Sequence, residues 1–78
     1  MFGKRLRAAR IARKYTQQSM ADILTISLNS YQKYEQGERN PSFDILVKIA
    51  DTLNVSIDWL LGRDDFLQSL GVSSDVFL

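Results

Sequence analysis

Amide, hydroxyl and ammonium side chains occupy most positions of one short stretch of this sequence, residues 28–33. Asn29, Ser30, Gln32 and Lys33 carry these groups, and Leu28 precedes them. Such side chains hydrogen-bond to the edges of nucleic-acid bases and to phosphates, and a leucine packs on the methyl group of thymine. The stretch therefore has the chemistry of a base-reading surface, provided that the fold turns these side chains outward.

The composition excludes most enzymatic chemistry. The 78 residues include no His and no Cys, so zinc fingers, Cys/His nucleophilic pairs and Ser-His-Asp triads are absent. Asp64 and Asp65 are adjacent, but neighbouring acids at a helix start serve as caps far more often than as an acid–base pair. We expect no enzyme, no catalytic residue, no metal ligand and no small-molecule cofactor.

The net charge of +1 conceals an asymmetric distribution. Residues 1–14 hold six basic residues and no acid, whereas residues 15–78 hold four basic and nine acidic residues. A segregated basic segment is typical of proteins that bind phosphate or an anionic membrane, although a solvated helix face is the default explanation. We expect Arg5, Arg13 and Lys14 to be partly solvated.

The sequence contains no segment suited to secretion or to membrane insertion. No apolar run follows the basic start, as it would in a signal peptide, and none approaches the roughly 20 residues of a transmembrane helix. The lack of cysteine agrees with a reducing compartment. We expect a cytoplasmic protein with no membrane partner.

Apolar spacing predicts an all-α fold. Phe2, Leu6 and Ala9 recur at the spacing of one helix face. Thr16, Ser27, Ser42 and Ser56 each stand before a later apolar run, as N-caps do. The predicted helices span residues 2–14, 17–24, 28–36, 43–53 and 57–61, with a weaker helix over 65–70. In the fourth helix the residues expected to face inward are Phe43, Leu46, Ile49, Ala50 and Leu53.

Residues 17–36 meet the requirements of a helix-turn-helix, in which the first helix holds the second against the domain. Ala21 is small where the two helices must cross, and Ile26 is an apolar residue in the turn. Tyr31 and Tyr34 share one side of the second helix and are expected to anchor it to the core. The remaining positions of this helix then face outward; they are Leu28, Asn29, Ser30, Gln32 and Lys33.

A series of short motifs is spread along residues 2–62. They are Leu6 and Arg10, Thr16-Gln17-Gln18, Ala21, Ile26-Ser27, Tyr34-Glu35-Gln36-Gly37, Pro41-Ser42, Ile49-Ala50, Leu53-Asn54-Val55-Ser56 and Asp58-Trp59-Leu60-Leu61-Gly62. In these motifs the chain resembles the Cro/CI-type, or Xre-type, helix-turn-helix regulators, which include the DNA-binding domains of lambdoid phage repressors. The resemblance implies a five-helix lambda-repressor-like DNA-binding domain over residues 1–63. Residues 64–78 lie outside the resemblance, and we expect them to form a C-terminal helical appendage.

The resemblance also assigns roles to individual residues. Gln17, supported by Gln18, matches the family's phosphate anchor at a helix start, and Ser30 matches a phosphate contact. Leu28, Asn29, Gln32 and Lys33 match its base-reading positions. Arg39 and Asn40 lie in the loop that follows the DNA backbone in relatives, and Arg10 with Glu35 resembles a structural ion pair. The candidate DNA-binding set is Gln17, Gln18, Ser27, Leu28, Asn29, Ser30, Gln32, Lys33, Arg39 and Asn40.

Three positions depart from the family pattern. Thr25 stands in the turn where relatives often have Gly, so the turn either takes another geometry or carries strain of about 1 kcal/mol or more. Leu28 replaces a polar reader, which changes the expected operator. Ser42 stands where some phage relatives place an arginine for the minor groove, and we expect it to act as an N-cap instead.

We therefore expect a sequence-specific transcriptional regulator, a repressor that binds a palindromic operator in double-stranded DNA as a homodimer. The apolar residues of the appendage, among them Phe66, Leu70 and Phe77, leave two readings open. They pair with a second subunit, which we favour, or they pack back on the domain. The alternative function is an antitoxin-like or other protein-interaction module that uses this apolar tail, with DNA binding secondary.

Overall fold

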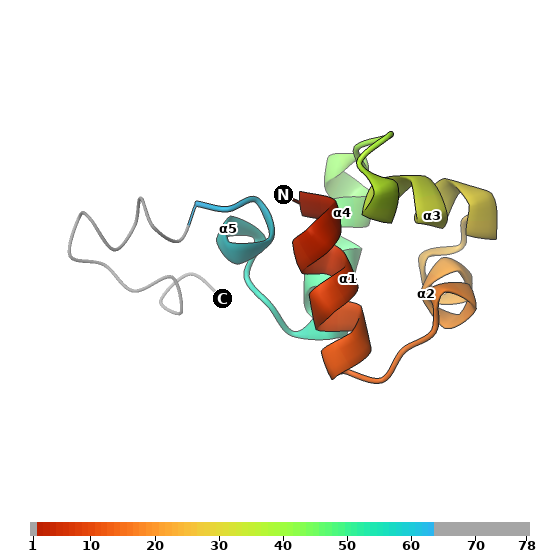
Figure 1. The fold of residues 1–78 in the computed structure, drawn as a ribbon, viewed down its shortest axis with the longest axis horizontal. Coiled ribbons are helices and arrows are strands. Elements are labelled where there is room, and N and C mark those ends of the chain that lie inside the picture. The colour runs from red at the N-terminus through yellow and green to blue at the C-terminus, as the bar shows by residue number, and fades with distance from the viewer. Residues whose placement is uncertain (1, 64–78) are drawn as a thin grey trace.

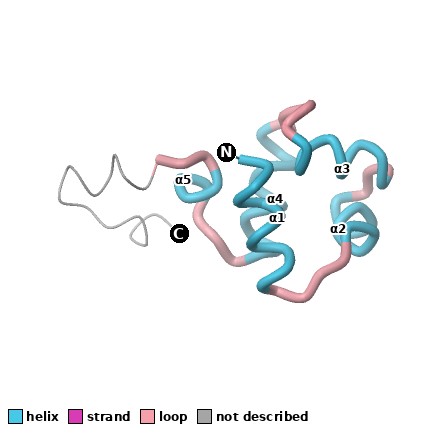
Figure 2. The backbone as a smooth tube through the Cα atoms, in the orientation of Figure 1, coloured by secondary structure: helices cyan, strands magenta, loops and turns pink. Residues whose placement is uncertain are grey.

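The computed structural model describes residues 2–63, and residues 1 and 64–78 lie outside its described part. The described chain is built from α1 (Phe2–Ala12), α2 (Gln17–Leu24), α3 (Leu28–Gln36), α4 (Phe43–Leu53) and α5 (Ile57–Leu60) (Figure 1). Helices and loops account for all of residues 2–63, with no strand (Figure 2). The all-α prediction is confirmed, whereas the predicted helix over 65–70 and the appendage fall outside the described residues.

Hydroxyl side chains begin four of the helices, as the sequence predicts. The hydroxyl oxygens of Thr16, Ser27, Ser42 and Ser56 each accept from the backbone N–H three residues further on. At α2 the capping is reciprocal, because the backbone N–H of Thr16 also donates to Ser19 Oγ at 2.9 Å. These local bonds satisfy free amides at the helix starts and set where each helix begins.

The five helices enclose one core. α1 packs against α3 and α5, while α2 packs against α3 and α4. Side chains from every helix contribute to the buried cluster, which includes Leu6, Met20, Leu24, Tyr31, Ile49, Leu53 and Leu60. Because the helix-turn-helix shares this core with α1, α4 and α5, the other three helices support the position of α3.

α1 meets the last turn of α3 backbone to backbone at Gly3. A Cβ atom at this position would lie 2.4 Å from the carbonyl oxygen of Glu35 and 2.8 Å from that of Tyr34. Both obstacles are main-chain atoms, so no side-chain rotation relieves the clash. Glycine is therefore required here, and its close approach sets the distance between α1 and α3.

The turn between α2 and α3 passes through a left-handed residue. Thr25 has φ 58° and ψ 44°, so the second of the two predicted outcomes holds and a β-branched residue carries strain of about 1 kcal/mol or more. The backbone N–H of Thr25 still donates to the carbonyl oxygens of Ala21 and Asp22 and so closes the end of α2.

The first helix is shorter than predicted. α1 ends at Ala12, two residues before the predicted end, and Lys14 after it is left-handed, at φ 64°.

The prediction that Phe43 faces inward is wrong. Its side chain is 86% exposed, although Leu46, Ile49, Ala50 and Leu53 on the same helix are buried as predicted. The helical period identified the correct face of α4, but Phe43 is the first residue of that helix and lies beyond the packed core. With Val47 and Leu61, each 47% exposed, it forms what we call the apolar face.

A shallow apolar groove adjoins this face. Its volume is about 250 Å³, and its lining residues come from the start of α1, the loop before α4, α4 itself and the end of α5. They are Phe2, Asn40, Pro41, Phe43, Leu46 and Leu61. Phe43 thus forms one wall of a groove that the described residues leave open.

Candidate nucleic-acid interface

α2 packs against α3, and one side of α3 remains on the surface. Ala21 has no exposed area, and Ile26 in the turn packs, partly buried, against the core. Tyr31 and Tyr34 are buried on the inner side of α3, where their rings meet edge to face with centroids 6.4 Å apart. The packing expected of a helix-turn-helix is therefore present.

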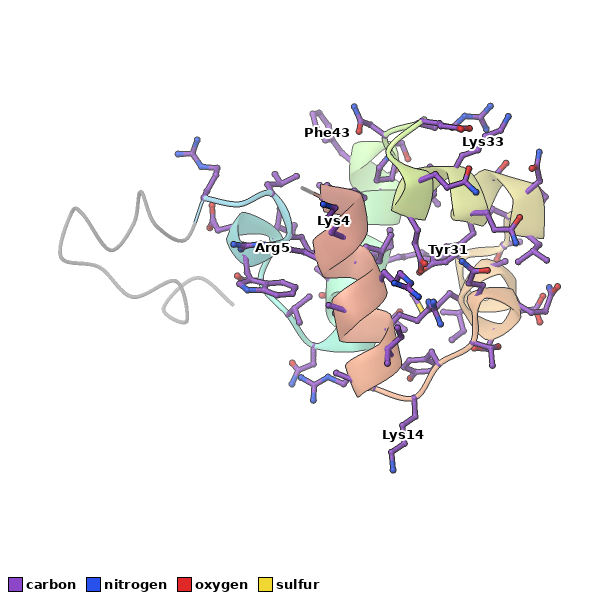
Figure 3. All side chains as sticks on the ribbon, viewed as in Figure 1. Lys4, Arg5, Lys14, Tyr31, Lys33 and Phe43 are labelled. Atoms are coloured by element: carbon purple, nitrogen blue, oxygen red, sulfur yellow. The ribbon has the colours of Figure 1, made fainter. Side chains whose placement is uncertain are left out.

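The predicted base-reading residues lie on the other side of α3. Asn29 is exposed, and Leu28, Gln32 and Lys33 are half-buried. Figure 3 shows Lys33 extending away from the domain, while Tyr31 points inward between the helices. The structure thus brings these four candidate readers onto one helix, with none of them in the core.

A nearly buried ion pair connects α1 to the last turn of α3. Arg10 Nε donates to Glu35 Oε2 at 2.7 Å, and Arg10 Nη2 donates to Glu35 Oε1 at 3.3 Å. The two side chains keep only 12% and 4% of their exposure. A bidentate, charge-assisted contact of this kind fixes orientation as well as distance. The Arg10–Glu35 pair suggested by the sequence is present and holds α3 against α1.

The Glu35 carboxylate has two further donors, so it joins three helices. Tyr31 Oη donates to Oε2 at 2.5 Å, and Gln17 Nε2 at the start of α2 donates to Oε1 at 3.1 Å. Burial alone would raise the pKa of Glu35, but the hydrogen bonds from Arg10, Tyr31 and Gln17 outweigh it and lower the pKa. The carboxylate is therefore held in its ionised form.

The same contacts act on the partners of Glu35. Burial and the neighbouring carboxylate raise the pKa of Tyr31, so its hydroxyl remains a donor. The hydrogen bond to Glu35 raises the pKa of Arg10. Arg10 is thus kept protonated, Tyr31 keeps its hydroxyl proton, and Glu35 stays ionised to accept from both.

One predicted phosphate anchor and one predicted base reader contact each other. Gln32 Nε2 on α3 donates to Gln17 Oε1 on α2 at 3.3 Å, while Gln17 also donates to Glu35. A continuous chain of hydrogen bonds therefore runs from buried Arg10 to the outer side of α3. We call Arg10, Gln17, Tyr31, Gln32 and Glu35 the Glu35 network.

The remaining candidates lie around the start of α2 and the two ends of α3. Ser27 Oγ donates to Ser30 Oγ at 3.0 Å, and Arg39 Nη1 reaches back along α3 to donate to the same oxygen at 3.3 Å. Gln18 is exposed and donates to Asp22 Oδ1 at 2.9 Å, apart from the Glu35 network. Asn40 is exposed beside the apolar groove.

Two arginines, Arg5 in α1 and Arg13 directly after it, have a role that sequence reasoning missed. Arg5 Nη1 donates to the carbonyl oxygen of Trp59 at 2.7 Å, and its guanidinium lies 5.1 Å from the centroid of the Trp59 ring. Arg13 Nε donates to the carbonyl oxygen of Leu53, the last residue of α4, at 2.9 Å. Positive charges are favourable at the carbonyl ends of helices. Part of the basic segment therefore stabilises the fold, which no local sequence signal reveals.

Other site types are not found within residues 2–63. No group of three or more acidic, histidine or cysteine residues there could hold a metal ion. In the same range, no helix has both the length and the hydropathy needed to cross a membrane.

Comparison with known proteins identifies relatives over most of the described chain. The sequence profile of the helix-turn-helix family matches residues 6–60. The cryptic phage CTXphi transcriptional repressor RstR of Vibrio cholerae serotype O1 is 55% identical over 60 residues, which are 77% of this chain and 54% of RstR. The chain spans about half the length of curated relatives such as RstR.

Two solved structures share the fold. The P22 c2 repressor protein, crystallised with a synthetic operator, has a TM-score of 0.76 and 28% identity, covering 82% of this chain and 97% of that one. The restriction-modification controller protein C.AhdI from Aeromonas hydrophila has a TM-score of 0.69 and 30% identity, covering 76% and 89%. The five helices are therefore arranged as in the P22 c2 repressor, whose structure contains a synthetic operator.

Proposed function

The chain belongs to the helix-turn-helix family, of the Xre type, and on this basis we propose that it is the DNA-binding part of a transcriptional repressor. The observation that carries the proposal is the outer side of α3, where Leu28, Asn29, Gln32 and Lys33 are presented by a helix anchored on Tyr31. We propose no catalytic activity, and a DNA partner implies a cytoplasmic location.

In this proposal the interface divides into residues that position the domain and residues that read sequence. α3 enters the major groove, where its four outward side chains meet base edges. Phosphate contacts come from the start of α2 and from both ends of α3, and they carry no sequence information. The proposed phosphate contacts are Gln17, Gln18, Ser27, Ser30, Arg39 and Asn40.

We further propose that two copies bind a palindromic operator. The apolar face supports this, since Phe43, Val47 and Leu61 would be removed from water by a second copy. A two-fold dimer places its α3 helices in successive major grooves, about 34 Å apart. Residues 64–78, the appendage expected to dimerise, lie outside the described part and remain a second candidate for the same contact.

The decisive experiment is selection of bound sequences from a random duplex pool, followed by a salt titration of the selected duplex. We expect a palindrome with half-sites about one helical turn apart, and an affinity that falls by several powers of ten per tenfold rise in salt. Binding that ignores both sequence and salt would contradict the proposed function.

Two lysines provide a matched pair for the same measurement. Lys33 lies on α3, whereas Lys48 is exposed on α4, which carries none of the proposed DNA contacts. We expect Lys33→Gln to weaken operator binding and to lower the salt slope by about one unit, because one cation leaves the interface. Lys48→Gln removes the same charge and should change the affinity by less than about twofold, since a surface cation outside the interface is largely screened from the DNA. Equal effects of the two variants would argue against α3 as the binding helix.

The alternative function, a protein-interaction module, depends on residues 64–78. Removing these residues separates the two functions. A chain of residues 1–63 that binds the selected duplex as tightly as the whole chain, where both are dimeric, supports the DNA-binding proposal, and a whole chain that selects no duplex supports the alternative.

A further inference from the structure

In the Glu35 network, the donor and the acceptor of each hydrogen bond follow a fixed order. Its origin is a carboxylate, and an ionised carboxylate has acceptors only. Arg10 supplies the opposite charge that keeps Glu35 ionised, at 2.7 Å, in a position where the Glu35 side chain is only 4% exposed. Any neighbour of Glu35 in this network must therefore present a donor.

This requirement passes from one glutamine to the next. Gln17 has to turn its NH2 group toward Glu35, which it does at 3.1 Å. Its carbonyl Oε1 then points the other way, so Gln32 has to turn its own NH2 group toward Gln17, at 3.3 Å. A side-chain amide has one oxygen and one NH2 group on its two ends. The orientation of both amides thus follows from the charge at Glu35.

After these contacts, Gln32 has one N–H and its carbonyl oxygen left for a ligand. The second N–H is committed to Gln17 Oε1. Adenine presents one acceptor, N7, and one donor, the N6 amino group, in the major groove. Guanine presents two acceptors, N7 and O6, for which Gln32 would need both of its N–H groups. One donor and one acceptor match adenine and leave guanine with one acceptor facing a carbonyl oxygen.

We propose that Glu35 is a specificity-determining residue, which acts through Gln17 to fix the amide orientation of Gln32, so that the base read by Gln32 is adenine. The inference rests on the proposed function, because it requires α3 to lie in the major groove. In this proposal Arg10 and Glu35 determine which base is accepted, although neither side chain touches DNA.

The test uses the selection from a random duplex pool, applied to the whole chain and to four variants. Gln32→Ala identifies the operator position that Gln32 reads, because the preference at that position disappears while the other positions keep theirs. We expect this position to be an A·T pair in the wild-type selection. A G·C pair there, in either orientation, would overturn the inference, and a wild-type protein that selects no sequence at all would instead overturn the proposed function.

Gln17→Met then breaks the chain of hydrogen bonds without touching the ion pair. It frees both N–H groups of Gln32, so we expect the ratio of adenine to guanine affinity at that position to fall by about tenfold, within the range of one lost base contact. The loss of the Gln17 phosphate contact lowers the affinity for all sequences equally and leaves this ratio unaffected. A ratio that stays at the wild-type value would overturn the inference.

Two further variants distinguish a reversal of the donor–acceptor order from a general weakening of the contacts of Glu35. Glu35→Gln gives position 35 a donor and should lower the same ratio, provided that circular dichroism shows the variant folded; if it unfolds, Gln17→Met decides. Tyr31→Phe removes a donor from Glu35 Oε2, the oxygen that does not contact Gln17. It should leave the ratio unchanged, and a tenfold fall in this variant would show that any weakening of Glu35 has the same effect, contrary to the inference.

Discussion

Two sides of this small domain are held together by different interactions. On the α2–α3 side, the Glu35 network joins three helices through directional hydrogen bonds and one nearly buried ion pair. On the α4–α5 side, the apolar packing is incomplete, with Phe43, Val47 and Leu61 exposed. The side-chain hydrogen bonds there, from Arg5 and Arg13, end on backbone carbonyls rather than on another side chain. Directional bonds fix the orientation of side chains, whereas apolar contacts tolerate sliding and repacking. The rigid side is the one proposed to read DNA, and the apolar side is the one proposed to bind a second copy.

The comparison predicts the largest loss of stability on the polar side. Glu35→Ala leaves the Arg10 guanidinium, 12% exposed, without its carboxylate, and we expect the free energy of unfolding to fall by about 3–5 kcal/mol. Urea denaturation at pH 7 measures it. A loss below about 1 kcal/mol would show that the Glu35 network adds little to stability.

Acid should weaken the polar side selectively. Because the fold lowers the pKa of Glu35 from its ordinary value of 4.5, stability from this group is fully present above that value. It declines as the pH falls through the lowered pKa, when the folded protein must bind a proton. We expect urea midpoints to fall more steeply with acid in the wild type than in Glu35→Gln. Parallel curves for the two proteins would contradict the assignment.

Gly3→Ala tests the close approach of α1 to α3, which supports the α2–α3 side. The new Cβ meets two backbone carbonyl oxygens, so α1 must move away from α3, with an expected loss of about 1–3 kcal/mol. Ala8 is exposed on the same helix, and Ala8→Ser is the control, with a change within about 0.5 kcal/mol. Thermal unfolding of both variants compares them, and equal melting temperatures would refute the steric argument.

Thr25→Gly should stabilise the domain. Glycine takes φ 58° without the strain of a β-branched residue, and we expect a gain of about 0.5–1 kcal/mol after the added freedom of the unfolded chain is included. Thr52→Gly, the same exchange within α4, should instead destabilise by a similar amount. The two urea midpoints should therefore move in opposite directions, and a common direction would contradict the expectation.

Phe43→Ser should have the smallest effect on the folded chain. Its side chain is 86% exposed, so we expect a change within about 0.5 kcal/mol in the stability of one copy. Self-association, measured by sedimentation equilibrium, should weaken by about tenfold or more if Phe43 anchors the dimer. Unchanged association would move the dimer contact away from the apolar face, to the candidate appendage.

Local patterns in the sequence predicted the elements but not the contacts between them. The N-caps, the helical periods and the spacing of Ala21, Ile26 and Tyr31 all involve residues a few positions apart, and the structure matches them. The need for Gly3 depends on a chain segment more than thirty residues away. The period of α4 shows which face Phe43 shares, yet not whether another element covers that end of the helix.

The candidate site shows the same division. Gln17 and Gln32 were both singled out by type and position, but for separate roles. Their contact with each other depends on how closely α2 approaches α3, which the sequence does not specify. Arg5 and Arg13 were expected to be partly solvated, and their hydrogen bonds to carbonyls 54 and 40 positions away arise only in the packed domain.

The Arg5–Trp59 contact also makes the protein convenient to observe. Trp59 is the single tryptophan of the chain, and its ring lies under a guanidinium carried by α1. Its fluorescence therefore reports whether α1 is docked, from a position in α5 rather than in the reading helix α3. Undocking of α1 in any of the variants above should appear as a change in emission, with no extrinsic label on the surface proposed to meet DNA.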